Sequence, residues 1–176
     1  MKTWKMRMLF ALCIFSAVLP SCSNNAPFNN LDIQNAVYLF GPALDSATVK
    51  IETACDCCTS NVAFFKDSTF IQIAYCVSGD HYSKGKFSVN GKEITLRFDS
   101  LSVTQSFGFV ADTAYEVSNI PLPNSTIHIT NYKSKQVLLY KSAGTTEYGI
   151  KDESITHNKL LERLKADSIW QKLHVK

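Results

Sequence analysis

The chain contains little glycine and none of the short motifs that bind phosphate or nucleotides. Seven glycines are spread over 176 residues, and neither a P-loop nor a Gly-rich dinucleotide motif is present. The G-x-S-x-G and H-E-x-x-H patterns of serine hydrolases and zinc proteases are also missing. We therefore predict a protein that is not an enzyme, with no catalytic residue and no cofactor.

The chain also lacks an excess of charge beyond its N-terminus. Three of the 18 basic residues lie in the first 21 positions, which leaves 15 Lys and Arg against 15 Asp and Glu. A balanced domain of this kind has no basic patch for nucleic acid, so we predict no nucleic-acid partner. It has no second long apolar run either, so we expect no membrane-spanning helix after the N-terminal segment.

The first 21 residues have the pattern of a secretory signal peptide. Lys2, Lys5 and Arg7 give a positive start, and an apolar run follows from Met8 to Leu19. This run is too short to span a bilayer as a helix.

The four residues Leu19-Pro20-Ser21-Cys22 that end this segment resemble the lipobox of bacterial lipoproteins, although Pro20 is unusual there. The resemblance implies cleavage after Ser21, a diacylglycerol thioether on Cys22 and a palmitate-type acyl chain on the new amino terminus. Cleavage nearby by the ordinary signal peptidase, with an incidental cysteine, is the alternative.

Residues 22–30 are predicted to be a lipidated tether, because they are polar, rich in Asn and contain one proline. They carry no acidic run, which is frequent in the surface-export signals of Bacteroidota-type lipoproteins. We therefore expect a lipid-anchored protein of the cell envelope, at the outer membrane and facing the periplasm. Residues 31–176 have a length that suits a single domain.

Most of this domain alternates apolar and polar residues with the period of β-strands that have one buried face. Breaks at Asp67-Ser68 and Asn90-Gly91 suit hairpin turns. We predict strands at 47–53, 60–66, 69–77, 82–89, 92–99, 103–110, 113–119, 125–132 and 135–142, with Ala36–Phe40 as a possible edge strand. The predicted fold is mainly β: an antiparallel meander, closed or partly closed as a lipocalin-like barrel, with a sandwich as the alternative.

The C-terminal region changes to the period of a helix. Apolar residues recur at spacings of three to five, with charged residues between them, over about 154–173. We predict one amphipathic helix that packs on the flank of the barrel or closes one end. A helix that binds a partner is the alternative.

Four cysteines remain beyond the signal peptide and Cys22, and three of them form the run Cys55-Asp56-Cys57-Cys58. If the strands at 60–66 and 69–77 pair around Asp67-Ser68, Cys76 faces residue 57, 58 or 59, at a Cα separation of roughly 4.5 Å that a disulfide can bridge. We predict Cys58–Cys76 as the first choice and Cys57–Cys76 as the second. Cys55 then pairs with Cys57 or Cys58, in a tight and reducible bridge.

The stretch from Cys55 to Phe98 resembles lipocalin-like envelope domains, among them the N-terminal domain of NlpE-like copper-resistance lipoproteins. The resemblance rests on a C-x-x-C at Cys55 and Cys58 before a β-meander, and it covers about a quarter of the chain. It implies the alternative function of a thiol-based metal or redox sensor, in which Cys55, Cys57 and Cys58 bind Cu or Zn. The other interpretation is two stabilising disulfides.

Five triplets of Asp, then Ser or Thr, then a small, aliphatic or Thr residue resemble the O-glycosylation motif of Bacteroidota envelope proteins. The candidate glycan sites are Ser46, Ser68, Ser100, Thr113 and Ser168. The alternative is that Asp-Ser pairs are common turn chemistry.

Taken together, these patterns predict a membrane-anchored, non-enzymatic β domain that binds a small apolar ligand or an envelope protein. An apolar cavity would favour the ligand, whereas a filled barrel with an exposed apolar patch would favour the protein partner.

Overall fold

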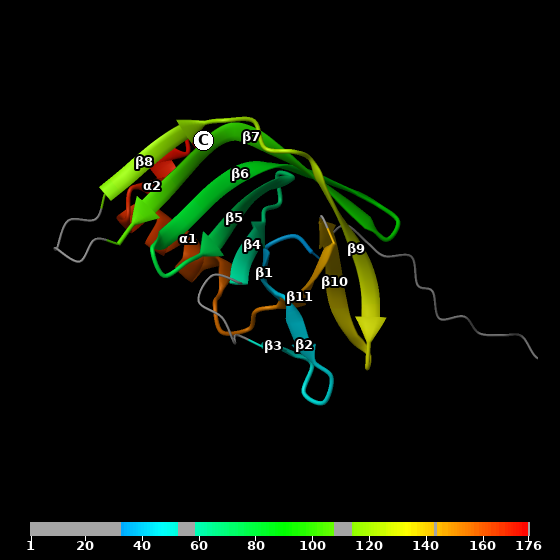
Figure 1. Ribbon diagram of the computed structural model, residues 1–176. Helices are drawn as coiled ribbons and strands as arrows, with labels where there is room; N and C mark the ends of the chain where they lie inside the picture. Colours follow the sequence, from blue (N-terminus) through cyan, green and yellow to red (C-terminus); the bar gives the residue numbers. More distant parts are fainter. Residues whose placement is uncertain (1–32, 53–58, 108–113, 143, 176) are drawn as a thin grey trace, which may run out of the picture.

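The computed structural model describes residues 33–52, 59–107, 114–142 and 144–175. These residues form eleven strands and two short helices (Figure 1). The elements are β1 (Ala36–Gly41), β2 (Ala43–Asp45), β3 (Lys50–Glu52), β4 (Thr59–Phe64), β5 (Thr69–Tyr75), β6 (Gly79–Asn90), β7 (Glu93–Ser106), β8 (Ala114–Asn119), β9 (Ser125–Tyr132), β10 (Lys135–Ser142), β11 (Thr145–Lys151), α1 (His157–Ala166) and α2 (Ile169–Lys172).

Eight of the strands close into an antiparallel barrel, in the order β6-β5-β4-β1-β11-β10-β9-β7 and back to β6. The long strand β7 makes the closure possible. Residues 93–96 at its start pair with β9, residues 101–106 near its end pair with β8, and it pairs with β6 along both parts. Strand β8 therefore lies outside the ring, at the outer edge of the sheet in Figure 1. The predicted mainly β fold with a closed barrel is confirmed, and the sandwich is not observed.

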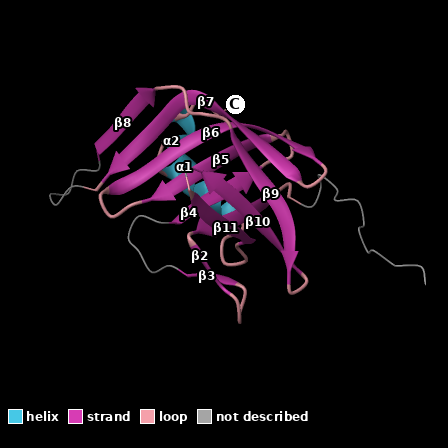
Figure 2. Cartoon of the chain, turned by 45° about the vertical axis from the view of Figure 1, so that its right-hand side comes forward, coloured by secondary structure: helices cyan, strands magenta, loops and turns pink. Residues whose placement is uncertain are grey.

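Both faces of the strands on one side of the barrel are buried. The interior cluster consists of Ile33, Ala36, Tyr38, Phe40, Val62, Phe64, Phe70, Phe87, Ile94, Leu96, Ile127, Ile129 and Leu138. The exterior cluster consists of Val37, Ala63, Ile71, Ile73, Tyr82 and Val103 of the sheet together with Leu160, Leu164, Ile169 and Leu173 of the C-terminal segment. The predicted C-terminal amphipathic segment thus covers the flank of the barrel, where the two helices lie behind the strands in Figure 2.

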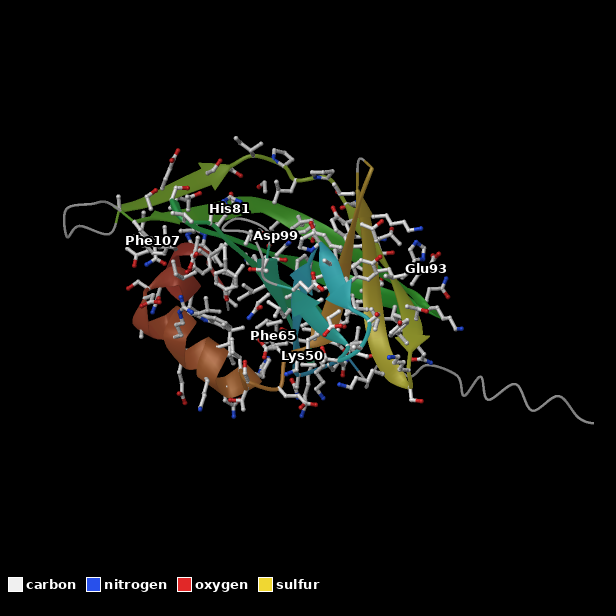
Figure 3. All side chains as sticks on the ribbon, turned by 60° about the horizontal axis from the view of Figure 1, so that its bottom comes forward. Lys50, Phe65, His81, Glu93, Asp99 and Phe107 are labelled. Atoms are coloured by element: carbon white, nitrogen blue, oxygen red, sulfur yellow. The ribbon has the colours of Figure 1, made fainter. Side chains whose placement is uncertain are left out.

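Phe65, which directly follows β4, is part of this contact between sheet and helices (Figure 3). Its ring meets His157 edge-on at a centroid distance of 4.7 Å and Trp170 at 6.2 Å. Burial lowers the pKa of His157, and its Nε2 atom is buried without a hydrogen-bond partner. Such an environment favours a neutral imidazole in a packing role.

The prediction of one continuous helix over 154–173 is wrong, because this segment contains two helices, α1 and α2. Thr156 caps α1 by accepting a hydrogen bond from the Lys159 amide at 3.3 Å, and α1 ends at Ala166. Ser168 has a φ of 59°, a left-handed conformation that a helix interior does not allow, and α2 begins only after it. The break turns the short second helix so that Ile169 and Leu173 both reach the sheet.

Several predicted strands differ from the observed ones. Ala36–Phe40 belongs to β1, which is no edge strand, because it pairs with β4 on one side and β11 on the other. The strands expected at 92–99 and 103–110 overlap one continuous strand, β7, whose register against β6 shifts between Ser83 and Gly85. Strand β11 was not predicted, and residues 43–52 form a separate small hairpin of β2 and β3.

Among the described residues, no helix has the length and apolar character to cross a membrane.

A buried polar cluster ties α1 to the outer face of the sheet. The carboxylate of Asp80 is 6 % exposed and lies 3.7 Å from the Arg163 guanidinium. The Tyr82 hydroxyl has two acceptors for its one proton, Oε1 of Gln105 at 2.8 Å and the Asp80 carboxylate at 3.3 Å. Burial raises the pKa of Asp80, and this effect exceeds the opposing effects of Tyr82 and Arg163. The cluster thus fixes the position of the helix rather than forming an open site.

Candidate functional site

One end of the barrel is closed by packed side chains. Ile33, Tyr38 and Phe64 are all fully buried there. The Phe64 ring meets Phe87 edge-on at 4.9 Å and Tyr38 at 5.9 Å. The Tyr38 hydroxyl donates a hydrogen bond to Oε1 of Gln136 at 2.7 Å. This end is filled by aromatic rings in edge-to-face contact, so no large ligand can enter from it.

The other end opens into a small cup with a volume of about 30 Å³. Its lining combines apolar and polar side chains: Phe40, Ser60, Val62, Gln72, Leu96, Phe98, Ser125, Ile127, Tyr140 and Glu147. A volume of this size holds about two water molecules, or one small polar group of a ligand. We call this site the barrel cup.

The strand registers explain why these residues converge. Phe40 of β1 lies opposite Ser60 of β4 on one side and Gly149 of β11 on the other. A Cβ atom on Gly149 would lie 2.6 Å from the Phe40 ring, so only glycine lets that ring lie flat across β11. Two residues before Gly149, Glu147 also faces inward, opposite Tyr140 of β10. The pleat thus places the Phe40 ring and the Glu147 carboxylate in the same cup.

Among the described residues, Glu147 is the one charged residue in the lining of the cup. Burial raises the pKa of this carboxyl group, and no hydrogen bond or neighbouring charge within the described chain opposes the effect. Two other polar groups of the lining, the hydroxyls of Tyr140 and Ser125, share a hydrogen bond of 3.3 Å. A half-buried carboxylate with a raised pKa that lies in a cavity is a candidate binding group.

A second, larger hollow lies beside the start of α1, between β1 and the residues after β11. It is shallow and opens widely to solvent, and Lys66, Lys151, Asp152 and Glu153 are among the residues that line it. Charged residues of both signs at its rim are exposed or half-buried. Ligand sites typically combine apolar walls with a few polar groups that point to one place. The barrel cup has this combination, and the open hollow does not.

The residues predicted from the cysteine and lipobox patterns lie mostly outside the described residues. These are Cys22, Cys55, Cys57 and Cys58. The hairpin register from which the Cys58–Cys76 bridge was derived is confirmed where it is described, because Thr59 lies opposite Tyr75 and Phe64 opposite Phe70. Cys76 follows the end of β5 and is half-buried. The disulfides and the Cu or Zn site stay predictions.

The described histidines do not assemble a metal site. His81 contacts Thr104 through Nδ1 at 3.0 Å, and His128 lies 3.5 Å from Glu93. Across the part of the chain that the structure describes, no group of three or more His, Cys, Asp or Glu side chains could hold a metal ion.

Four of the candidate glycosylation residues are exposed: Ser46, Ser68, Ser100 and Ser168. Thr113 lies outside the described residues. At two of these sites the preceding aspartate caps a turn, since Asp45 accepts from the Ala47 amide at 2.8 Å and Asp67 from the Thr69 amide at 3.1 Å. At these two sites the hydrogen bonds agree with the turn chemistry that is common for Asp-Ser pairs. Glycosylation at the five candidates stays a prediction.

Apolar side chains are also exposed along β8, the outermost strand of the sheet, and near the end of β7. Val117 and Ile120 are 53 % and 66 % exposed on and after β8. Val77 and Phe107 are also exposed, and the Phe107 amide donates to Ser78 at 3.1 Å. They lie toward the other end of β8, because Ser106 lies opposite Ala114, whereas Asn119 lies opposite Leu101. In Figure 3, Phe107 lies at the end of β7 opposite to Glu93. Val117 and Ile120 lie within three residues of each other, and exposed apolar residues that lie close together are typical of contact surfaces.

Comparison with known proteins identifies the architecture. No protein-family model matches the chain, and no curated protein matches it in sequence. A solved structure, described as a streptavidin-like protein from Bacteroides eggerthii, is similar with a TM-score of 0.53 and 13% sequence identity. The match covers 73% of this chain and 86% of that protein. At this identity the similarity concerns the fold, so this chain has the architecture of a streptavidin-like β-barrel.

Proposed function

We propose that this chain is a lipid-anchored lipoprotein of the cell envelope whose barrel binds a small ligand in the barrel cup without catalysing a reaction. The observation that carries the proposal is the cup itself: it is an opening in an otherwise filled barrel, and it contains a carboxylate without a partner. Barrels of about eight strands leave room for side chains or for one small ligand. The streptavidin-like fold supports a binding role.

The size of the cup limits the ligand. The packed rings of Phe40, Phe64 and Phe70 leave no room for a large apolar molecule inside the barrel. We therefore propose a ligand that inserts one small group into the cup, while the remainder stays outside the barrel. This differs from the small apolar ligand that the aromatic content of the sequence favours.

Blocking the cup tests the proposal. In Ser125→Phe, a bulky ring at the mouth should abolish the binding of small molecules that shift the NMR signals of cup residues in the wild-type, full-length protein purified in mild detergent. Thr126→Phe is the matched control, because Thr126 is exposed and is the next residue of β9. The proposal is wrong if Ser125→Phe and Thr126→Phe bind such molecules equally well.

The anchor has its own test, based on the lipobox-like residues before Cys22. Intact-mass analysis of the protein extracted from membranes should give a chain that begins at Cys22 and carries a diacylglycerol group and an acyl chain. In Cys22→Ser, the protein should leave the membrane fraction. An unmodified Cys22 in the mature wild-type protein would contradict the anchor.

A protein partner is the second candidate function, and the exposed apolar residues Val117 and Ile120 on and after β8 favour it. Strand β8 also has one edge that is unpaired among the described strands. Loss of partner binding in Val117→Ser, with cup binding unchanged, would distinguish this function from the first.

A further inference from the structure

From the barrel cup we infer the chemical class of its ligand: an organic cation that presents a primary ammonium group to Glu147. The inference rests on the proposed ligand-binding function of the cup and adds the identity of the group that enters it. It is carried by the placement of one carboxylate among aromatic rings in a confined space.

The first argument is charge. Of the residues that the structure describes, Glu147 is the one charged residue of the lining, and neither Lys nor Arg is among the others. Within the described chain, the carboxylate has no cation and no hydrogen-bond donor of its own. Glu147 is half-buried, and partial removal of a carboxylate from water disfavours its charged form. A ligand cation beside the carboxylate would offset this cost.

The second argument is the nature of the walls. Phe40, Phe98 and Tyr140 line the cup with aromatic rings. The faces of such rings attract cations, and they offer nothing to an anion. A carboxylate beside aromatic walls is therefore selective for a cation over a neutral or negative group of the same size.

The third argument is size and hydrogen bonding. At about 30 Å³, the cup accepts an ammonium group but is small for a quaternary ammonium or an aromatic ring. An ammonium group has three donors, and the cup supplies acceptors at Glu147, Ser60 and the Gln72 side-chain carbonyl. These acceptors come from β11, β4 and β5, so they lie on separate strands around the opening.

A series of probes with equal chain length tests this selectivity. Butylammonium, butanol and butyrate are titrated into the full-length protein in mild detergent, with NMR shifts of cup residues as the readout. We expect butylammonium to bind about tenfold or more tightly than either other probe, because a charge-assisted hydrogen bond replaces a neutral one. Its affinity should fall as the pH is lowered and Glu147 becomes protonated.

Glu147→Gln keeps the shape of the side chain and removes its charge. We expect this variant to lose at least about tenfold in butylammonium affinity and to become indifferent to pH over the acidic range. Glu116→Gln is the matched control, because Glu116 is exposed on β8. Its butylammonium affinity should equal that of the wild type.

The outcomes separate the two proposals. Tighter binding of butanol or butyrate, with loss of that binding in Ser125→Phe, would overturn the cation inference and leave the ligand-binding function standing. Equal butylammonium affinity in Glu147→Gln and the wild type would also overturn the inference. Absence of any shift in cup residues with all three probes would overturn both.

Discussion

Phe64→Ala should lower the free energy of unfolding by about 3–5 kcal/mol, the range for a buried phenylalanine. Phe64 is fully buried, and its ring makes edge-to-face contacts with Tyr38 and Phe87 at the closed end of the barrel. The substitution removes both ring contacts and leaves a void, because strands on all sides of the barrel hold the surrounding residues in place.

Urea unfolding followed by circular dichroism measures this loss. Phe107→Ala is the control, since Phe107 is 47 % exposed and should change the stability by about 0.5 kcal/mol or less. A Phe64→Ala loss below about 1 kcal/mol would contradict the packed interior, because a loosely filled barrel would close around the void.

Leu164→Ala should lower the free energy of unfolding by about 2–5 kcal/mol. Leu164 of α1 is 2 % exposed and belongs to the cluster on the outer face of the barrel. The helices are too short to be stable alone, so they depend on this apolar contact with Ile71, Ile73 and Val103. The same contact also stabilises the barrel, because the helices shield an apolar outer face of the sheet from water.

The neighbouring substitution Leu161→Ala provides the comparison, because Leu161 is only half-buried. It has the same side chain on the same helix, so equal helix propensity cancels between the two variants. Urea unfolding should give a clearly smaller loss for Leu161→Ala. Equal losses for the two variants would show that α1 does not pack on the barrel in solution.

The alternating patterns of the sequence predicted strands well where one face is apolar throughout. The hairpin between β6 and β7 is an example: Gly91 has a φ of 57°, and the turn lies one residue later than expected, between Asn90 and Glu93. The same pattern could not show which face points inward. Ile71, Ile73 and Tyr75 share a face as predicted, but this face points outward to the helices, because both faces of β5 are buried.

Two differences between the predicted and the observed elements have local causes that the spacing of apolar residues does not show. Strand β11 escaped prediction because its inward positions Glu147 and Gly149 are not apolar. The C-terminal helix was predicted as continuous because Asp167 and Ser168 suit a helix pattern by their polarity, whereas the positive φ of Ser168 ends α1.

The lack of an apolar pattern in β11 also explains why the candidate site was not predicted. Glu147 lies in a strand without an apolar pattern, so no local signal distinguished it from the other acidic residues. Its significance comes from residues distant in sequence: Phe40, Ser60 and Gln72 on other strands form the cup around it. Polar residues in the interior of a barrel break the local rules of a stable fold, and such breaks are expected at functional sites.

The stability of Glu147→Gln across pH tests the central claim most directly, namely that Glu147 is kept for a ligand and not for the fold. Burial raises the pKa of Glu147 above its ordinary value of 4.5. The folded protein therefore holds a proton more strongly than the unfolded chain, and its stability falls as the pH rises from 4.5 through the raised pKa. The glutamine variant lacks this loss.

In urea unfolding without ligand, Glu147→Gln should match the wild type in acid and become the more stable protein as the pH approaches neutrality. Groups common to both proteins, such as Asp80, cancel in the difference. A Glu147→Gln variant that is less stable than the wild type at neutral pH would show that the carboxylate has a partner within the folded chain, and this would contradict the account.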